Sequence, residues 1–343
     1  MSCVTLAVGS QNVLQMLNVS EKDFITGENL KQMFLKSYDI FKENFEIINS
    51  INVFPVPDGD TGINMLETLR AIRNELVELN GAYNCGDVIT KIALGAFNGS
   101  AGNSGIIFSE YLHGLEYAWS GLEVLKTPDL KLGFKKAAEA AYKSIDQPRE
   151  GTILTVQRKV AEFINMNDYS ESSPFIILVD AFNEAKLSLL ETHFILTEAN
   201  KAKTIDAGAL AFVLILEGFI SAVFDEEIFS IATTKTLDGN ILPFLKVDIE
   251  RLVLIEHEWE IQFNIDSIKK SVEMIKDSLK KEGECLIITY DHEGPDFKVH
   301  IHIKKPVNEF LKKIKYLFGE IKNIRILDLK NQNEEFIHLL KDK

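Results

Sequence analysis

The stretch Asn52-Val53-Phe54-Pro55-Val56-Pro57-Asp58-Gly59-Asp60-Thr61-Gly62-Ile63-Asn64 sets two carboxylates among prolines and glycines, with an amide at each end. Proline fixes φ and glycine lets the backbone approach a ligand, so the stretch predicts a rigid, open loop. Asp58 and Asp60 repel each other unless a cation lies between them, and such oxygen ligands suit a hard cation such as Mg²⁺. An ordinary turn is the alternative, because Asp-Gly pairs are common in turns. Helical patterns on both sides of the loop favour the metal site.

Those helical patterns place the loop at a helix start. Apolar residues at spacings of three, four and seven predict a helix that begins near Thr26 and leads into the loop. Thr61 is expected to cap a second helix, whose apolar face is Met65, Leu69, Ile72, Leu76 and Leu79. Free backbone N–H groups at such a helix start favour anions.

A second junction of small residues, NGSAGNSG at 98–105, also precedes a helix. Gly102, Ser104 and Gly105 would suit a phosphate cradle of backbone N–H groups, although small residues are common at helix junctions of any kind. Helical patterns continue to about residue 234, and no strand is expected before about residue 235. We therefore predict an all-helical domain over residues 26–234, after an N-terminal extension of residues 1–25.

The pattern changes after a predicted linker at residues 235–245. The expected elements alternate as strand, helix, strand, strand, helix, strand, over 252–265, 267–281, 285–290, 297–303, 307–318 and 323–329. This order is that of a ferredoxin-like split βαβ sandwich. It predicts a small α+β domain over residues 246–343.

Within that domain, His300 and His302 share one face of a strand, because side chains alternate with period two. Two imidazoles at this spacing can chelate one metal ion. They can also form a plain polar outer face opposite Val299, Ile301 and Ile303, which is the more frequent situation.

The composition excludes several classes of protein. A net charge of −14 over 343 residues leaves no basic stripe for nucleic acid. Three distant cysteines and the lack of a signal peptide indicate a reducing, cytoplasmic location. The segment 207–224 is apolar, but it contains Glu217 and has no basic flank. A helix buried in a bundle is therefore expected there, and no transmembrane segment.

The first stretch also carries a family resemblance. Asn-Val-Phe-Pro-Val-Pro-Asp-Gly-Asp-Thr-Gly-x-Asn-Met resembles the signature of the dihydroxyacetone-kinase L-type phosphotransferase family, in particular its fatty acid kinase A branch. The resemblance implies an eight-helix barrel that binds ATP or ADP. It also implies that Asp58 and Asp60 hold two Mg²⁺ ions bridging the nucleotide phosphates, with Asn52 as a third candidate ligand and Thr61 in the catalytic loop.

The same resemblance extends to the Gly-Asn-Ser-Gly-Ile-Ile and Glu-Gly-Thr-Ile-Leu-Thr-Val segments and to a segment that closes over the nucleotide. The family often has an arginine where this chain has Ala101. The nucleotide contacts that the resemblance implies are Asn64, Gly102, Asn103, Ser104, Gly105, Gly151, Thr152, Asp206 and Gly208. In the second domain, the His-x-His pair resembles a zinc site of the family that also uses a cysteine. Glu260 stands at the matching position, with His257 nearby, and a carboxylate can replace a thiolate on zinc.

The resemblance thus implies an ATP-binding kinase subunit that phosphorylates a fatty acid on a separate carrier protein, and a homodimer is expected. A fatty acid carboxylate is ionised at neutral pH, so no catalytic base is needed. Two alternatives stay open. A dihydroxyacetone-type kinase would need a base for its hydroxyl substrate, and a nucleotide-binding regulatory or scaffolding protein would show no turnover. The family usually continues with a third domain that helps engage the carrier, and these 343 residues are not expected to include it.

Overall fold

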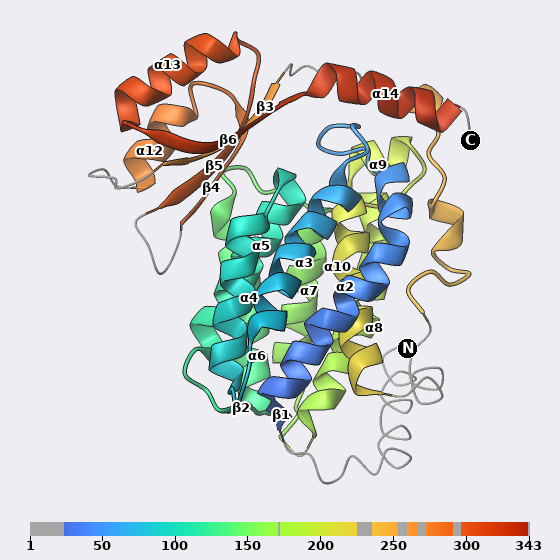
Figure 1. Cartoon of the computed structure of the whole chain (residues 1–343). Helices are drawn as coiled ribbons and strands as arrows, with labels where there is room; N and C mark the ends of the chain where they lie inside the picture. The colour runs from blue at the N-terminus through green and yellow to red at the C-terminus, as the bar shows by residue number, and fades with distance from the viewer. Residues whose placement is uncertain are drawn as a thin grey trace.

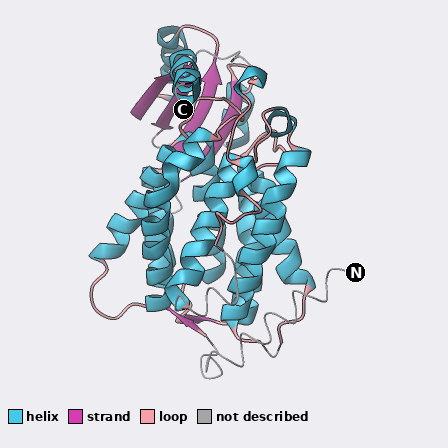
Figure 2. Ribbon diagram, turned by 90° about the vertical axis from the view of Figure 1, so that its right-hand side faces the viewer, coloured by secondary structure: helices cyan, strands magenta, loops and turns pink. Residues whose placement is uncertain are grey.

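The computed structural model describes residues 24–170, 172–224, 235–252, 255, 259–265, 272–290 and 296–341. Most of these residues are helical, and a four-stranded antiparallel sheet lies in the C-terminal part. Figure 1 shows the sheet lying over one end of a bundle of upright helices. In the view turned by 90°, the sheet again lies at that end only (Figure 2).

The N-terminal part is a ring of helices. They are α2 (Gly27–Ser50), α3 (Thr61–Glu78), α4 (Cys85–Gly99), α5 (Gly102–Trp119), α6 (Thr127–Ser144), α7 (Ile153–Met166), α8 (Pro174–Ile195), α9 (Thr197–Lys201) and α10 (Ala207–Val223). From α2 to α8, each helix packs against the next one in the chain, and α10 packs against both α8 and α2. The apolar stripes of these helices therefore meet in one continuous core.

Helix α10 confirms the prediction of a buried apolar helix. Its side chains are buried from Ala207 to Ile220, and Glu217 accepts a hydrogen bond from Thr236 N at 3.0 Å. A buried carboxylate needs such a partner. Among the described helices, none combines the length and apolar character that a membrane span requires.

Two short strands correct the expectation that no strand precedes residue 235. Strand β1 (Ile25–Thr26) pairs with β2 (Val124–Leu125) at the end of the ring opposite the large sheet. Ile25, expected in a loose extension, is fully buried. Thr26 also begins α2 through a reciprocal capping box with Asn29. Residues 1–23 lie outside the described part of the chain.

The predicted linker packs against the ring. Thr204 Oγ1 donates to Phe244 O at 2.7 Å, and Asp248 N donates to Ala202 O at 2.9 Å. A short 3₁₀ helix, η2 (Leu242–Phe244), lies in the linker, and another, η3 (Ile249–Arg251), follows it. Phe244 and Asp248 are therefore held against the turn that precedes α10.

The C-terminal part has the predicted order of elements. It contains β3 (Trp259–Ile265), α12 (Val272–Leu279), β4 (Glu284–Tyr290), β5 (Phe297–Ile303), α13 (Val307–Phe318), β6 (Ile321–Asp328) and α14 (Leu329–Lys341). The strands lie antiparallel in the order β4-β5-β3-β6. Helix α14 was not predicted, and it extends from the sheet across the end of the ring (Figure 1).

The sheet has one apolar and one polar face, and both are buried on the central strands β3 and β5. The apolar face packs with α12 and α13 in a second core. On the polar face, three register pairs align Glu260 with His302, Gln262 with His300, and Asn264 with Lys298. The interpretation of the histidine face as an outer, solvated face is wrong, because the helical ring covers it.

Candidate functional site

The loop between α2 and α3 is held by Asn49, in the last turn of α2, and by Asn52, just after its end. Asn52 Oδ1 accepts from Thr61 N at 2.8 Å, and Asn52 Nδ2 donates to Val56 O at 2.9 Å. Asn49 Oδ1 accepts from the backbone N–H groups of residues 62 and 63 at 2.7 and 3.2 Å. Gly59 takes a φ of +70°, which favours glycine. The loop is therefore rigid, as the prolines and glycines predicted.

These bonds correct the expected start of α3. Thr61 is the first residue of the helix, and Asp60 precedes it without a side-chain capping bond. Thr61 N and the next two N–H groups already donate to Asn52 and Asn49, so the expected free donors for an anion are absent from this turn. Asn52 is fully buried, and both polar atoms of its amide hold the loop.

Asp58 and Asp60 border a pocket that is also lined by residues from the sheet and from α5. Its lining comprises Asn52, Pro55, Val56, Asp58, Asp60, Thr61, Asn64, Asn103, Ser104 and Glu260. Sequence reasoning placed most of these residues at one nucleotide site, and the structure brings them together. It did not place Glu260 there, because nothing local relates β3 to the loop.

The pocket concentrates negative charge. Burial, together with the charges of Asp60 and Glu260, raises the pKa of Asp58 well above its usual range. Burial and Glu260 also raise the pKa of Asp60 to about 6. Asp60 Oδ2 is buried and has no hydrogen-bond partner within the described residues. An orphaned oxygen among three carboxylates fits a divalent cation, which would offset their repulsion.

The start of α5 forms the opposite wall. Helix α5 begins at Gly102 without a side-chain capping bond. In the first turn of α3, by contrast, backbone N–H groups donate to the side chains of Asn49 and Asn52. A Cβ on Gly102 would lie 2.4 Å from Asn64 Nδ2, and one on Gly105 would lie 2.8 Å from Thr68 Oγ1. These glycines therefore let α5 approach α3, which is the packing explanation for the junction. The uncapped N–H groups beside Ser104 remain suited to an anion.

Gly208 lies at the edge of this wall, whereas Asp206 serves the fold. A Cβ on Gly208 would lie 3.0 Å from Ser104 Oγ. Asp206 Oδ1 caps α10 by accepting from Ala209 N at 2.7 Å, and burial raises the pKa of Asp206 to about 7. The structure thus places Gly208 beside Ser104, which lines the pocket, and gives Asp206 a capping role.

Gly151 and Thr152 lie away from the pocket lining. A Cβ on Gly151 would lie 2.6 Å from Leu196 N, and Thr152 Oγ1 donates to Arg149 O at 2.7 Å. Neither residue is among those that line the pocket. Both are engaged in the turn that starts α7.

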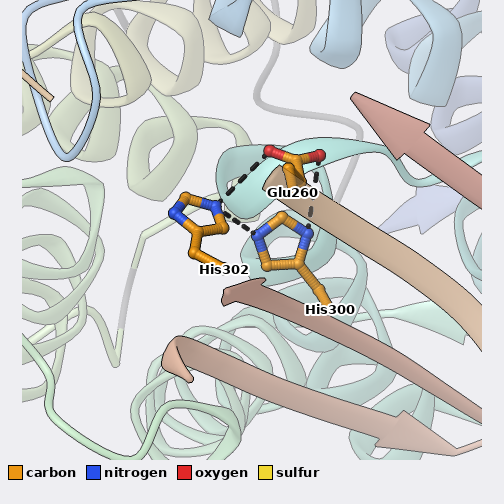
Figure 3. A group of neighbouring side chains, drawn as sticks. All are labelled: Glu260, His300 and His302. Atoms are coloured by element: carbon orange, nitrogen blue, oxygen red, sulfur yellow. Dashed lines mark hydrogen bonds and ion pairs between the residues drawn. The ribbon is translucent and has the colours of Figure 1, made fainter. Parts of the chain in front are cut away.

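Glu260, His300 and His302 converge on one point of the polar sheet face (Figure 3). The Nε2 atoms of the two histidines lie 3.1 Å apart, and Glu260 oxygens lie 3.7 Å from His300 Nδ1 and 3.5 Å from His302 Nε2. One ligand atom from each residue lies within 4.8 Å of the others. Three such ligands with an open fourth position fit zinc. His257, the other candidate, lies outside the described residues.

The pKa values of the two histidines in this cluster shift in opposite directions. Burial lowers the pKa of His300 to about 4. Burial would also lower the pKa of His302, but hydrogen bonds with Cys285 and Glu260 raise it to about 10. Burial would raise the pKa of Glu260, but the two histidines lower it to about 2. Cys285 of β4 therefore lies beside His302, a neighbour that sequence reasoning did not identify.

Further residues of the sheet hold it against the ring. Lys298 Nζ donates to Phe97 O at 2.6 Å and to Ser100 O at 2.9 Å, and Gln262 Nε2 donates to Ser100 O at 2.9 Å. Burial lowers the pKa of Lys298 to about 7. The alternation of polar and apolar residues in β3 and β5 was the signal that could have found them.

Helix α14 and strand β6 also contact the site. Asn333 Nδ2 donates to Pro57 O at 2.6 Å, and a Cβ on Gly59 would lie 2.4 Å from Phe336 Cδ2. Arg325 of β6 donates to Asn64 Oδ1, which lies 3.2 Å from its Nη2. The C-terminal part thus contacts the loop and Asn64 from outside the pocket lining, and sequence reasoning missed these contacts.

Two parts of the chain match known families. Residues 55–221 match the DAK2 domain, and residues 256–336 match the fatty acid kinase A-like middle domain. Similar curated proteins include uncharacterized proteins of Staphylococcus saprophyticus, Staphylococcus epidermidis and Staphylococcus aureus strain USA300, each 27% identical to this chain. The matches cover 91%, 93% and 91% of this chain and 57%, 58% and 57% of those proteins. The chain therefore spans a little more than half the length of these relatives.

Proposed function

We propose that this chain, which carries a DAK2 domain followed by a fatty acid kinase A-like middle domain, is the ATP-binding subunit of a fatty acid kinase. The observation that carries the proposal is the convergence of Asp58, Asp60 and Glu260 on one pocket at the uncapped start of α5. The closed ring of long helices supports the eight-helix barrel expected over residues 26–234. The second apolar core supports a separate domain over residues 246–343.

In this proposal, Asp58 and Asp60 hold the two Mg²⁺ ions implied by the resemblance. The orphaned Asp60 oxygen and the mutual repulsion of the carboxylates support this assignment. The bound ions would neutralise charge on the nucleotide phosphates. Asn103, Ser104 and the N–H groups at the start of α5 bind phosphate oxygens. The first turn of α3 does not, because its N–H groups already donate to Asn49 and Asn52.

The proposed substrate is the carboxylate of a fatty acid presented by a carrier protein. This nucleophile is ionised at neutral pH, so the pocket does not have to supply a general base. The carboxylates that line the pocket are assigned to metal ions, which fits a reaction driven by positioning and charge neutralisation. A hydroxyl substrate would need a base in addition.

We propose zinc at the Glu260, His300 and His302 cluster. The three buried ligand atoms within 4.8 Å of one another support it. Glu260 belongs to this cluster and also lines the phosphate pocket, so the two metal sites would adjoin. Zinc would then fix the polar sheet face over the mouth of the ring.

The first experiment measures Mg²⁺-dependent ATP binding by the wild type and by Asp58→Asn. ATP consumption is then followed with a fatty acid on its carrier, with dihydroxyacetone, and with ATP alone. We expect consumption and acyl phosphate only in the first mixture. Phosphorylation of dihydroxyacetone would indicate the glycerone kinase alternative, and binding without consumption in any mixture would indicate the regulatory alternative.

A further inference from the structure

The phosphate pocket has an acidic lining. It contains Asp58, Asp60 and Glu260, and none of its described lining residues is a lysine or an arginine. Metal ions offset part of the charge of a bound nucleoside triphosphate, but charge on the transferred group still needs positive partners. A basic side chain just outside the lining is therefore the group to look for.

Arg325 is such a side chain, and it comes from the C-terminal part. It lies on β6 in register with Gln262 of β3, on the sheet face that covers the ring. Its Nη2 lies 3.2 Å from Oδ1 of Asn64, a residue that lines the pocket. The Nδ2 atom of the same amide faces Gly102 at the start of α5. The Asn64 amide thus lies between the guanidinium and the expected phosphate-binding helix start.

The present contacts of Arg325 are weak enough for its guanidinium to exchange them for a contact with phosphate. Its guanidinium also pairs with Glu67, whose Oε2 lies 3.4 Å from Nη1, and the two side chains are 34% and 42% exposed. Exposed pairs of this kind contribute little.

We propose that Arg325 binds the terminal phosphate of Mg·ATP and so completes the phosphate site from the C-terminal part. The proposal rests on the proposed nucleotide site. A planar guanidinium can donate two parallel hydrogen bonds to phosphate oxygens, which a lysine cannot do. The middle domain then acts as a sensor of the γ-phosphate, in addition to covering the ring.

The test compares Mg·ATP and Mg·ADP affinities by calorimetry in Arg325→Ala and Arg325→Lys. We expect Arg325→Ala to lose about tenfold or more in ATP affinity, the effect of one charge-assisted contact, and to bind ADP as the wild type does. Arg325→Lys should recover only part of the loss. Arg251→Ala, which removes an exposed arginine paired with Asp248, is the matched control and should change neither affinity.

Glu67→Gln gives a second, independent measurement. It removes the competing partner of Arg325 without altering the pocket lining, so ATP affinity should stay equal or rise. An unchanged ATP-to-ADP affinity ratio in both Arg325 variants would overturn the proposal, as would an equal loss for both nucleotides. If the wild type binds neither nucleotide, the proposed function fails as well. If Asp58→Asn abolishes binding while the Arg325 ratio stays unchanged, this inference alone fails.

Discussion

The Nζ atom of Lys298 lies 2.6 Å from the carbonyl oxygen of Phe97, so a side chain of strand β5 caps the C-terminal end of α4. The same ammonium group reaches Ser100 O and Ser100 Oγ, both at 2.9 Å. These acceptors lie directly before the start of α5, where the phosphate site is proposed. The sheet and the ring therefore share one hydrogen-bond network, and the position of α5 depends on both.

We expect Lys298→Met to lower the stability of the whole chain. It removes the charged donor that the buried oxygens of Phe97 and Ser100 share, and losing a hydrogen bond to a charged group costs roughly 1–3 kcal/mol. Thermal unfolding of the variant should therefore begin several degrees below that of the wild type. Lys330→Met, at an exposed position of α14, is the control and should melt with the wild type. Equal melting temperatures for all three proteins would show that the Lys298 contacts contribute nothing.

Asp58→Asn should raise stability while it abolishes Mg²⁺-dependent nucleotide binding. Burial and the neighbouring charges of Asp60 and Glu260 oppose ionisation of Asp58, so the metal-free protein carries repulsion that the variant loses. Melting in chelator and calorimetry with Mg·ATP measure the two effects. Asp248→Asn is the control, because this partly buried carboxylate has favourable partners and its loss should not stabilise. A variant that binds Mg·ATP normally would contradict the metal site.

The sequence predicted those features of the site that are encoded locally. Asp58, Asp60 and the junction before α5 stand out because their residue types and spacing carry the chemistry. The same reasoning failed for Thr61, because Asn49 and Asn52 fill the first turn of α3 from the preceding helix. It also failed for the solvation of the His300 face, because alternation reveals two faces of a strand but not what covers each one.

Helix α14 escaped prediction for a related reason. Its described buried residues are Leu329, Asn333 and Phe336. Only two of them are apolar, which is too few to identify a helix from its hydrophobic period. Its contacts with Pro57 and Gly59 join segments at opposite ends of the chain. Long-range contacts of this kind decide which residues share the pocket, and no local pattern records them.

Gly59→Ala should distort the loop through its contact with α14. The added Cβ would lie 2.4 Å from Phe336 Cδ2, and the φ of +70° is itself unfavourable for alanine. We expect a loss of stability that is smaller in a Phe336→Ala background, where the clash is removed. A double-mutant cycle of chemical denaturation measures this coupling. Strictly additive losses of stability would mean that Gly59 and Phe336 are not energetically coupled.

Asp206 should make the stability depend on pH. Its pKa is about 7 in the folded chain, because it is buried, and about 3.9 when unfolded. The folded state therefore binds more protons between these values, so this group lowers the free energy of unfolding as the pH rises from about 4 to 7. Asp206→Asn keeps an acceptor for Ala209 N and removes the titration. Denaturation at pH 5 and 7.5 should favour the variant more at the higher pH, and parallel pH curves would contradict this.

The C-terminal part should bind zinc at the cluster of Glu260, His300 and His302. Elemental analysis of protein prepared without chelators should find one zinc ion per chain in the wild type and none in His300→Ala or His302→Ala, since each variant removes one of three buried ligands. Zinc loss should also lower the melting temperature, because a structural metal contributes directly to folding. His338→Ala, on α14 and outside the cluster, is the control and should retain the ion. Wild-type protein without zinc would leave Glu260 and His302 as a buried ion pair beside a neutral His300, the arrangement that their opposed pKa shifts describe.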